Sequence, residues 1–171
     1  MPRSMVYTVD VDVPAAVMYR NFTAIDYWQD LVAFYEQNAA RTEIAHFSTD
    51  DTGTDISFSH ILSAQDLPPI ARPVLPGTFV ITREQHFEPF HEATNRAFGR
   101  YRAQIPTVPV EVTGTYILQD TELGSQMSLD TLCTARVPII GGQIEHLLAN
   151  GLRTLFTREG EFTADWIGSH R

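Results

Sequence analysis

The sequence predicts an α+β protein in which a curved antiparallel sheet of seven strands surrounds one long C-terminal helix, with two short helices after the first strand. Apolar and polar residues alternate in seven segments, which is typical of strands with one buried face. Residues 143–167 instead carry apolar side chains at helical spacing. A sheet with one apolar face must pack that face on another element, and this segment is the only long helix that the sequence predicts.

The first elements are a strand and two helices. Apolar residues from Tyr7 to Val13 alternate with Thr8, Asp10 and Asp12, so one face of this strand is expected to be buried. Pro14 should then open a helix over 15–23, because proline is tolerated at the first helical position. Asp26 is expected to cap a second helix over 27–37.

Six further strands are expected after the helices. Turn sequences at 50–53 and 122–125 separate neighbouring strands, as antiparallel hairpins require. The connection 66–77 holds four prolines, so it is neither a strand interior nor a long helix. It is either a packed loop over one end of the core or a lid that gates a ligand. The expected strands cover 43–48, 54–64, 78–87, 93–105, 108–119 and 126–137.

The last helix is predicted to be strongly amphipathic. At 1.5 Å per residue it would run roughly 37 Å, enough to traverse the concave face of the sheet. Gly141 and Gly142 precede it and form either a flexible turn or an anion site made of backbone amides. The expected inward stripe is Ile144, Leu147, Leu148, Gly151, Leu155, Phe162 and Trp166, opposite Glu145, Asn150, Arg153, Thr157, Glu161 and Asp165.

The composition excludes several classes of protein. A chain of 171 residues with 43% hydrophobic and 19% charged residues fits one globular domain without a membrane span. The N-terminus lacks the pattern of a secretory signal, so we expect a cytoplasmic protein. A net charge of −9 disfavours nucleic acid and anionic membrane surfaces as partners. Cys133 is the single cysteine and the six histidines show no ligand spacing, so no metal and no cofactor are expected.

The order of these elements resembles the helix-grip fold of the START-like (SRPBCC) superfamily, which includes lipid-transfer proteins, polyketide cyclases and plant ligand carriers. Segments 112–118 (VTGTYIL) and 137–148 (VPIIGGQIEHLL) are similar to an uncharacterised branch of that superfamily. The resemblance implies one START-like domain over 1–171. It also implies a cavity for a small hydrophobic ligand between the sheet and the C-terminal helix.

Several inward strand positions are candidates for ligand contact. Polar groups among apolar neighbours could orient a ligand in a mostly apolar cavity, although each could equally be a core group with a backbone or water partner. Gly151 in the helix, facing Gly114 in the sheet, indicates either close packing or room for a ligand. The predicted ligand-binding residues are Phe58, His60, Tyr101, Gly114, Tyr116, Leu129, Thr131, Leu148, Gly151 and Leu155.

Three functions remain open from the sequence. No nucleophile elbow, phosphate loop, dinucleotide motif or zinc-protease motif occurs, which favours a noncatalytic carrier or sensor of a lipid-like or polycyclic molecule and assigns no catalytic residue. A cyclase, dehydratase or hydrolase-like enzyme would use His60 and Tyr116 as an acid–base pair. An interaction module or homodimer with a filled core is the third hypothesis, because Trp28, Phe34 and Tyr35 could be partly exposed.

Overall fold

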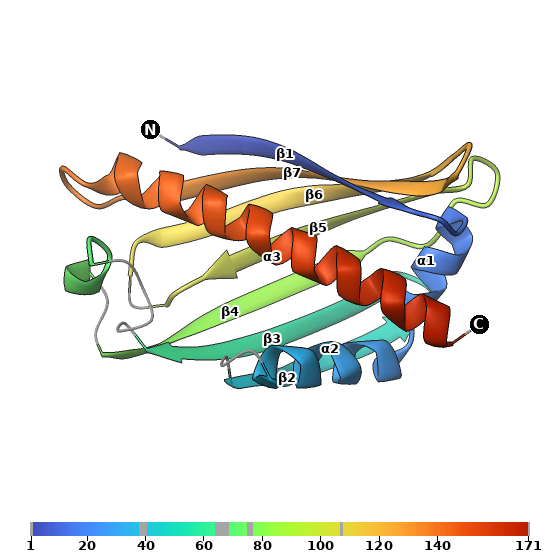
Figure 1. Cartoon of the computed structure of the whole chain (residues 1–171), viewed down its shortest axis with the longest axis horizontal. Coiled ribbons are helices and arrows are strands. Elements are labelled where there is room, and N and C mark those ends of the chain that lie inside the picture. Colours follow the sequence, from blue (N-terminus) through green and yellow to red (C-terminus); the bar gives the residue numbers. More distant parts are fainter. Residues whose placement is uncertain (1, 38–40, 64–68, 75–76, 107, 171) are drawn as a thin grey trace.

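The computed structural model describes residues 2–37, 41–63, 69–74, 77–106 and 108–170. Its seven strands form one antiparallel sheet in the order β1-β7-β6-β5-β4-β3-β2, so β2 to β7 form a meander and β1 pairs with β7. The sheet curves around the long helix α3, Gly141–Ser169, which runs along its concave face (Figure 1). The strands are β1 Arg3–Val11, β2 Arg41–Asp50, β3 Gly53–Ser63, β4 Thr78–Phe87, β5 Arg96–Gln104, β6 Val110–Thr121 and β7 Gly124–Ala135.

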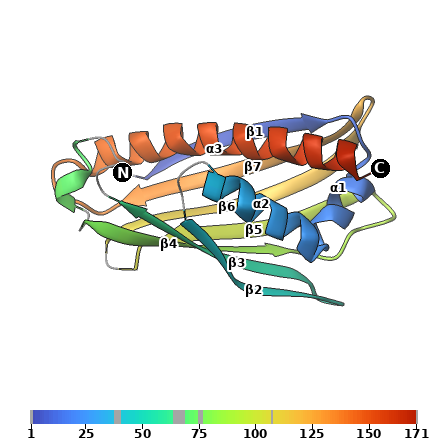
Figure 2. The same ribbon diagram turned by 60° about the horizontal axis from the view of Figure 1, so that its bottom comes forward.

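Two short helices follow β1, as the sequence predicts. α1 spans Ala15–Phe22 and α2 spans Ile25–Gln37. Figure 2 shows α2 on the same side of the sheet as α3, and α2 packs mainly on β2. The predicted α+β helix-grip architecture is therefore confirmed. None of the helices in the described ranges is long and apolar enough to cross a membrane.

The register of the sheet places inward residues in rows that run across the strands. One row contains Ile56, Gln85, Tyr101, Gly114 and Thr131, each paired with the next. Residues opposite one another on neighbouring strands have their Cβ atoms about 5 Å apart. Side chains that are far apart in sequence therefore meet on the concave face.

The next row explains where a charged residue enters the interior. It contains Phe58, Arg83, Ala103, Val112 and Cys133. Arg83 is only 7% exposed, although arginine is seldom buried without a partner. The partner comes from α3 and is described with the candidate site.

The predicted orientation of the last helix is wrong in part. Gly151 is exposed, with open space where a Cβ would stand, so it does not face Gly114 across a gap. Glu145, expected on the outer face, is 2% exposed. Its carboxylate accepts a hydrogen bond of 2.9 Å from the backbone N–H of Ala135, at the end of β7. That bond satisfies a buried donor at the strand end, and Glu145 faces the sheet together with Ile144 of the expected stripe.

Some predicted boundaries also move. Asp26 lies in the first turn of α2 and not at its cap, a position where a carboxylate still favours the helix dipole. Gly141 is the first residue of α3, and its N–H donates to the carbonyl of Val137, so this amide is not free to bind an anion. β5 begins three residues late because Asn95 has a φ of 50° in the preceding turn.

The proline-rich connection is only partly described. Residues 72–74 form a short 3₁₀ helix, Arg72–Val74, and Ile70 is half-buried. Leu67 and Leu75, two apolar residues of this connection that would cover one end of the core in a packed loop, lie outside the described residues. The choice between a packed loop and a lid therefore stays a prediction.

The aromatic side chains of α2 pack into the core. Trp28 is 2% exposed and Tyr35 is 7% exposed, while Phe34 is half-buried. The expectation that Trp28 and Tyr35 are partly exposed is wrong, because α2 presents both to the concave face of the sheet. This removes most of the exposed aromatic surface on which the interaction-module hypothesis rested.

Candidate functional site

A cavity of about 240 Å³ lies between α3 and the strands β3 to β6. Its walls are mostly apolar on both sides. Half-buried leucines of α3 face it from above, because they occur at helical spacing over the concave face. The apolar wall consists of Leu62, Ile81, Ala103, Ile105, Val110 and Val112 from the sheet, with Leu148, Leu152, Leu155 and Phe156 from α3.

Five polar side chains interrupt this wall, Tyr35, His60, Arg83, Tyr101 and Gln104, and the first four are held by hydrogen bonds. The Nδ1 atom of His60 is hydrogen-bonded to the Thr42 hydroxyl at 3.0 Å. The Tyr101 hydroxyl is hydrogen-bonded to the hydroxyl of Thr131. The Tyr35 hydroxyl accepts a bond of 3.2 Å from Arg83. Each of these groups is thus held in place by a partner while its side chain borders the cavity.

A buried ion pair joins the sheet to the helix beside this cavity. Arg83 of β4 donates two hydrogen bonds to the carboxylate of Glu159 in α3, at 2.6 Å and 3.1 Å. The two side chains are 8% and 17% exposed. Burial raises the pKa of Glu159, whereas the two bonds from the guanidinium favour its ionised form. The bidentate geometry is that of a charged pair, which fixes α3 over the middle of the sheet.

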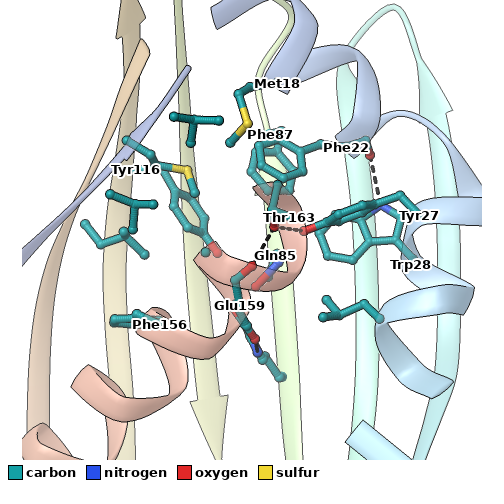
Figure 3. A pocket seen from close by; sticks show the side chains of 17 residues that line it. Met18, Phe22, Tyr27, Trp28, Gln85, Phe87, Tyr116, Phe156, Glu159 and Thr163 are labelled. Atoms are coloured by element: carbon teal, nitrogen blue, oxygen red, sulfur yellow. Dashed lines mark hydrogen bonds and ion pairs between the residues drawn. The ribbon is translucent and has the colours of Figure 1, made fainter. Parts of the chain in front are cut away.

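A second, smaller cavity of about 40 Å³ lies on the other side of the ion pair (Figure 3). Arg83 and Phe156 line both cavities, so the two meet at these side chains. Gln85, Tyr116 and Thr163 contribute polar groups to the smaller one. Aromatic side chains of α1 and α2 close it on the remaining side: Phe22, Tyr27 and Trp28.

The structure brings together only some of the predicted ligand-binding residues. His60, Tyr101, Leu148 and Leu155 line the larger cavity, whereas Tyr116 and Leu129 line the smaller one. Phe58 lies under the guanidinium of Arg83 at 5.8 Å, and Thr131 supports Tyr101. Gly114 lies under the ring of Tyr101, where any Cβ would overlap the ring. Gly151 is on the outer face of α3 and borders neither cavity.

The most polar residues of the site, Arg83, Gln85 and Glu159, are not among the predicted ones. The sequence contained a signal for two of them. Arg83 and Gln85 share the inward face of one strand with the apolar residues Phe79, Ile81 and Phe87, at a spacing of two residues. Charged and amide side chains at inward positions of a strand need partners inside the protein. Glu159 lacked such a signal, because its place on α3 depends on the orientation of the helix.

The proposed acid–base pair of His60 and Tyr116 does not share a cavity. Burial, together with the nearby charge of Arg83, lowers the pKa of His60 to about 4. Burial raises the pKa of Tyr116 well above its usual range. Neither group titrates near neutral pH, which is where an acid–base catalyst works best.

The lowered pKa of His60 predicts a loss of stability in acid. An unfolded histidine takes up a proton near pH 6.5, whereas the folded one does so only near pH 4. The unfolded state therefore binds more protons between these values, and the free energy of unfolding falls as the pH drops from 6.5 to 4, by up to about 3 kcal/mol. Urea unfolding gives the free energy of unfolding at pH 7.5 and at pH 4.5, and we expect the loss between these values to be smaller for His60→Gln than for the wild type. His46→Gln, at an exposed histidine, is the matched control and should lose as much as the wild type. An equal loss in all three proteins would contradict the prediction.

This arrangement of sheet, helix and interior cavity is the helix-grip fold of the START-like superfamily. The structure of Ara h 8.0201 has the same fold, with a TM-score of 0.59, 13% identity and 99% of each chain covered. Norcoclaurine synthase from Thalictrum flavum, in complex with dopamine and hydroxybenzaldehyde, gives a TM-score of 0.57 at 9% identity, covering 100% of this chain and 89% of the synthase.

The chain belongs to the family described as "Protein of unknown function (DUF2505)", whose model matches residues 6–167. The uncharacterised protein Rv0481c of Mycobacterium tuberculosis is a relative, 28% identical over 172 residues that cover 98% of each chain. The predicted helix-grip fold is confirmed, and the chain belongs to a family of unknown function, as the sequence resemblance indicates.

Proposed function

We propose that the protein binds a compact hydrophobic molecule, without chemical change, in the larger cavity. The observation that supports this most strongly is an interior space of about 240 Å³ with mostly apolar walls and four polar groups held in place by hydrogen bonds. Small-molecule sites usually combine an apolar cavity with a few convergent polar groups. Protein interiors otherwise contain few voids larger than a water molecule.

The volume restricts the size of the ligand. An engineered apolar cavity of about 150 Å³ holds benzene, so by simple scaling this cavity holds roughly ten non-hydrogen atoms. That favours a molecule with one or two rings over a long acyl chain. Norcoclaurine synthase, which has the same fold, was crystallised with two single-ring aromatic molecules, dopamine and hydroxybenzaldehyde.

The alternative of a cyclase or dehydratase has weaker support. Its proposed acid and base, His60 and Tyr116, border different cavities and have pKa values far from neutrality. Binding by apolar burial needs neither group to titrate and gains roughly 25 cal/mol per Å² of apolar surface removed from water.

Filling the cavity should abolish binding. Ala103 lies in the sheet wall of the larger cavity, so Ala103→Phe would occupy much of its volume. We expect the affinity for naphthalene, measured by isothermal titration calorimetry, to fall at least tenfold, since the bound probe and the new ring cannot coexist. Ala45→Phe, the same change at an exposed alanine of β2, should leave binding unchanged. Mass spectrometry of organic extracts would show whether the purified protein carries a native ligand. The proposal fails if naphthalene does not bind, or binds both variants equally.

A further inference from the structure

One side chain of the smaller cavity has an unsatisfied hydrogen-bonding atom. Gln85 is 4% exposed on the inner face of β4, and its Oε1 atom has no hydrogen-bond partner among the described residues. Leaving a buried acceptor unpaired costs about 1–3 kcal/mol. The large majority of buried side-chain polar atoms are paired. A carbonyl oxygen of this kind, in the wall of a cavity, is suited to accept a bond from a bound molecule.

A second group can take part in the same site. Tyr116 also lines the smaller cavity, and a tyrosine hydroxyl can both donate and accept a hydrogen bond. Its hydroxyl group can therefore donate a bond to a molecule in this space. Figure 3 shows Tyr116 and Gln85 around the same space, beside Glu159. The space is about 40 Å³, which suits one or two groups of the size of water.

The charges around the two cavities favour a neutral group. Arg83 and Glu159 form an ion pair whose charges cancel. His60 is uncharged at neutral pH, because its pKa is lowered to about 4. A carboxylate or an ammonium group added here would be a buried charge without a counterion, which is costly. A hydroxyl group can both donate and accept without adding charge.

We propose that the smaller cavity is the polar subsite of the ligand site, where Gln85 accepts a hydrogen bond from a neutral hydroxyl group of the bound molecule. This rests on the proposed function, because the apolar body of the same molecule lies in the larger cavity. The shared walls at Arg83 and Phe156 place the two subsites next to each other. The ligand class is therefore a compact ring system with an alcohol or phenol group at one end.

The experiment compares three probes at pH 7 by titration calorimetry: naphthalene, 2-naphthol and 2-naphthoate. We expect the ratio of 2-naphthol to naphthalene affinity to be about threefold to tenfold higher in the wild type than in Gln85→Met, the range that one buried hydrogen bond provides. 2-Naphthoate should bind more weakly than naphthalene. Gln29→Met is the matched control, since Gln29 is exposed on α2 and borders neither cavity, and it should leave the ratio unchanged.

Each outcome decides the matter. If naphthalene does not bind the wild type, the proposed function fails and the subsite fails with it. If naphthalene binds but the ratio is the same in Gln85→Met, only the subsite fails, and the oxygen of Gln85 is satisfied without the ligand. Tight binding of 2-naphthoate would overturn the preference for a neutral group. Should Gln85→Met not fold, Tyr116→Phe removes the second group, and an unchanged ratio there also rejects the subsite.

Discussion

Replacing Arg83 by Met is expected to lower the free energy of unfolding by about 3–5 kcal/mol at pH 8. The reason is the carboxylate that remains. Glu159 accepts both of its short hydrogen bonds from Arg83 and is largely shielded from water. Without the guanidinium it becomes a buried and unpaired charge. Chemical unfolding followed by far-UV circular dichroism measures the loss.

The pH dependence of this variant distinguishes an unpaired charge from lost packing. Removing Arg83 leaves burial to act alone on Glu159, which raises the pKa of its carboxyl above that of the charged pair. A folded pKa above the unfolded one means that the folded state binds more protons. Stability is then retained at low pH and lost as the pH rises. The destabilisation of Arg83→Met should therefore grow from pH 5 to pH 9, whereas a packing defect would be constant.

Two further variants complete the test. Arg102→Met breaks an exposed ion pair with Glu111, so it should cost less than about 1 kcal/mol. The double variant Arg83→Met with Glu159→Leu replaces both charges by apolar groups and should recover most of the lost stability. If the double variant is as unstable as Arg83→Met alone, the pair does not act as proposed, and the loss comes from packing around β4 and α3.

The alternation of apolar and polar residues was sufficient to predict the sheet. Strands such as β3 and β7 bury every second side chain over most of their length, and turns mark their ends. The long helix was also predictable as an element, because no other segment is long enough to cover the concave face. The boundaries that moved depend on single backbone angles, such as that of Asn95, which no periodicity reports.

The candidate site was harder to predict, for a physical reason. Inward positions on strands follow from a period of two, so His60, Tyr101 and Tyr116 were placed on the correct face. Their grouping depends on strand register and on the orientation of α3. Glu145 binds a backbone amide of β7, and Glu159 pairs with Arg83. These two bonds hold two glutamates of α3 toward the sheet. An argument from amphipathicity alone would place such charged residues on the solvent side of the helix.

Trp28→Ala is expected to destabilise the protein by about 3–5 kcal/mol, as truncations of large buried aromatic residues do. Its indole is surrounded by the rings of Phe22, Tyr27, Phe58 and Phe87, with centroid distances of 4.9 to 6.1 Å. The indole N–H also donates a bond of 2.9 Å to the carbonyl of Phe22, which holds α1 against α2. The substitution therefore removes the centre of an aromatic cluster and leaves that carbonyl without its donor.

The comparison with Trp166→Ala shows whether α2 belongs to the core or to an interaction surface. Trp166 is half-buried near the end of α3 and bonds to the side chain of Asp30, so its loss should cost clearly less. Both variants can be measured by urea unfolding with circular dichroism, since tryptophan fluorescence itself changes. If Trp28→Ala costs under 1 kcal/mol, the aromatic cluster is not a rigid part of the interior. The smaller cavity, which Trp28 helps to enclose, would then lose a wall on which the subsite for the hydroxyl group depends.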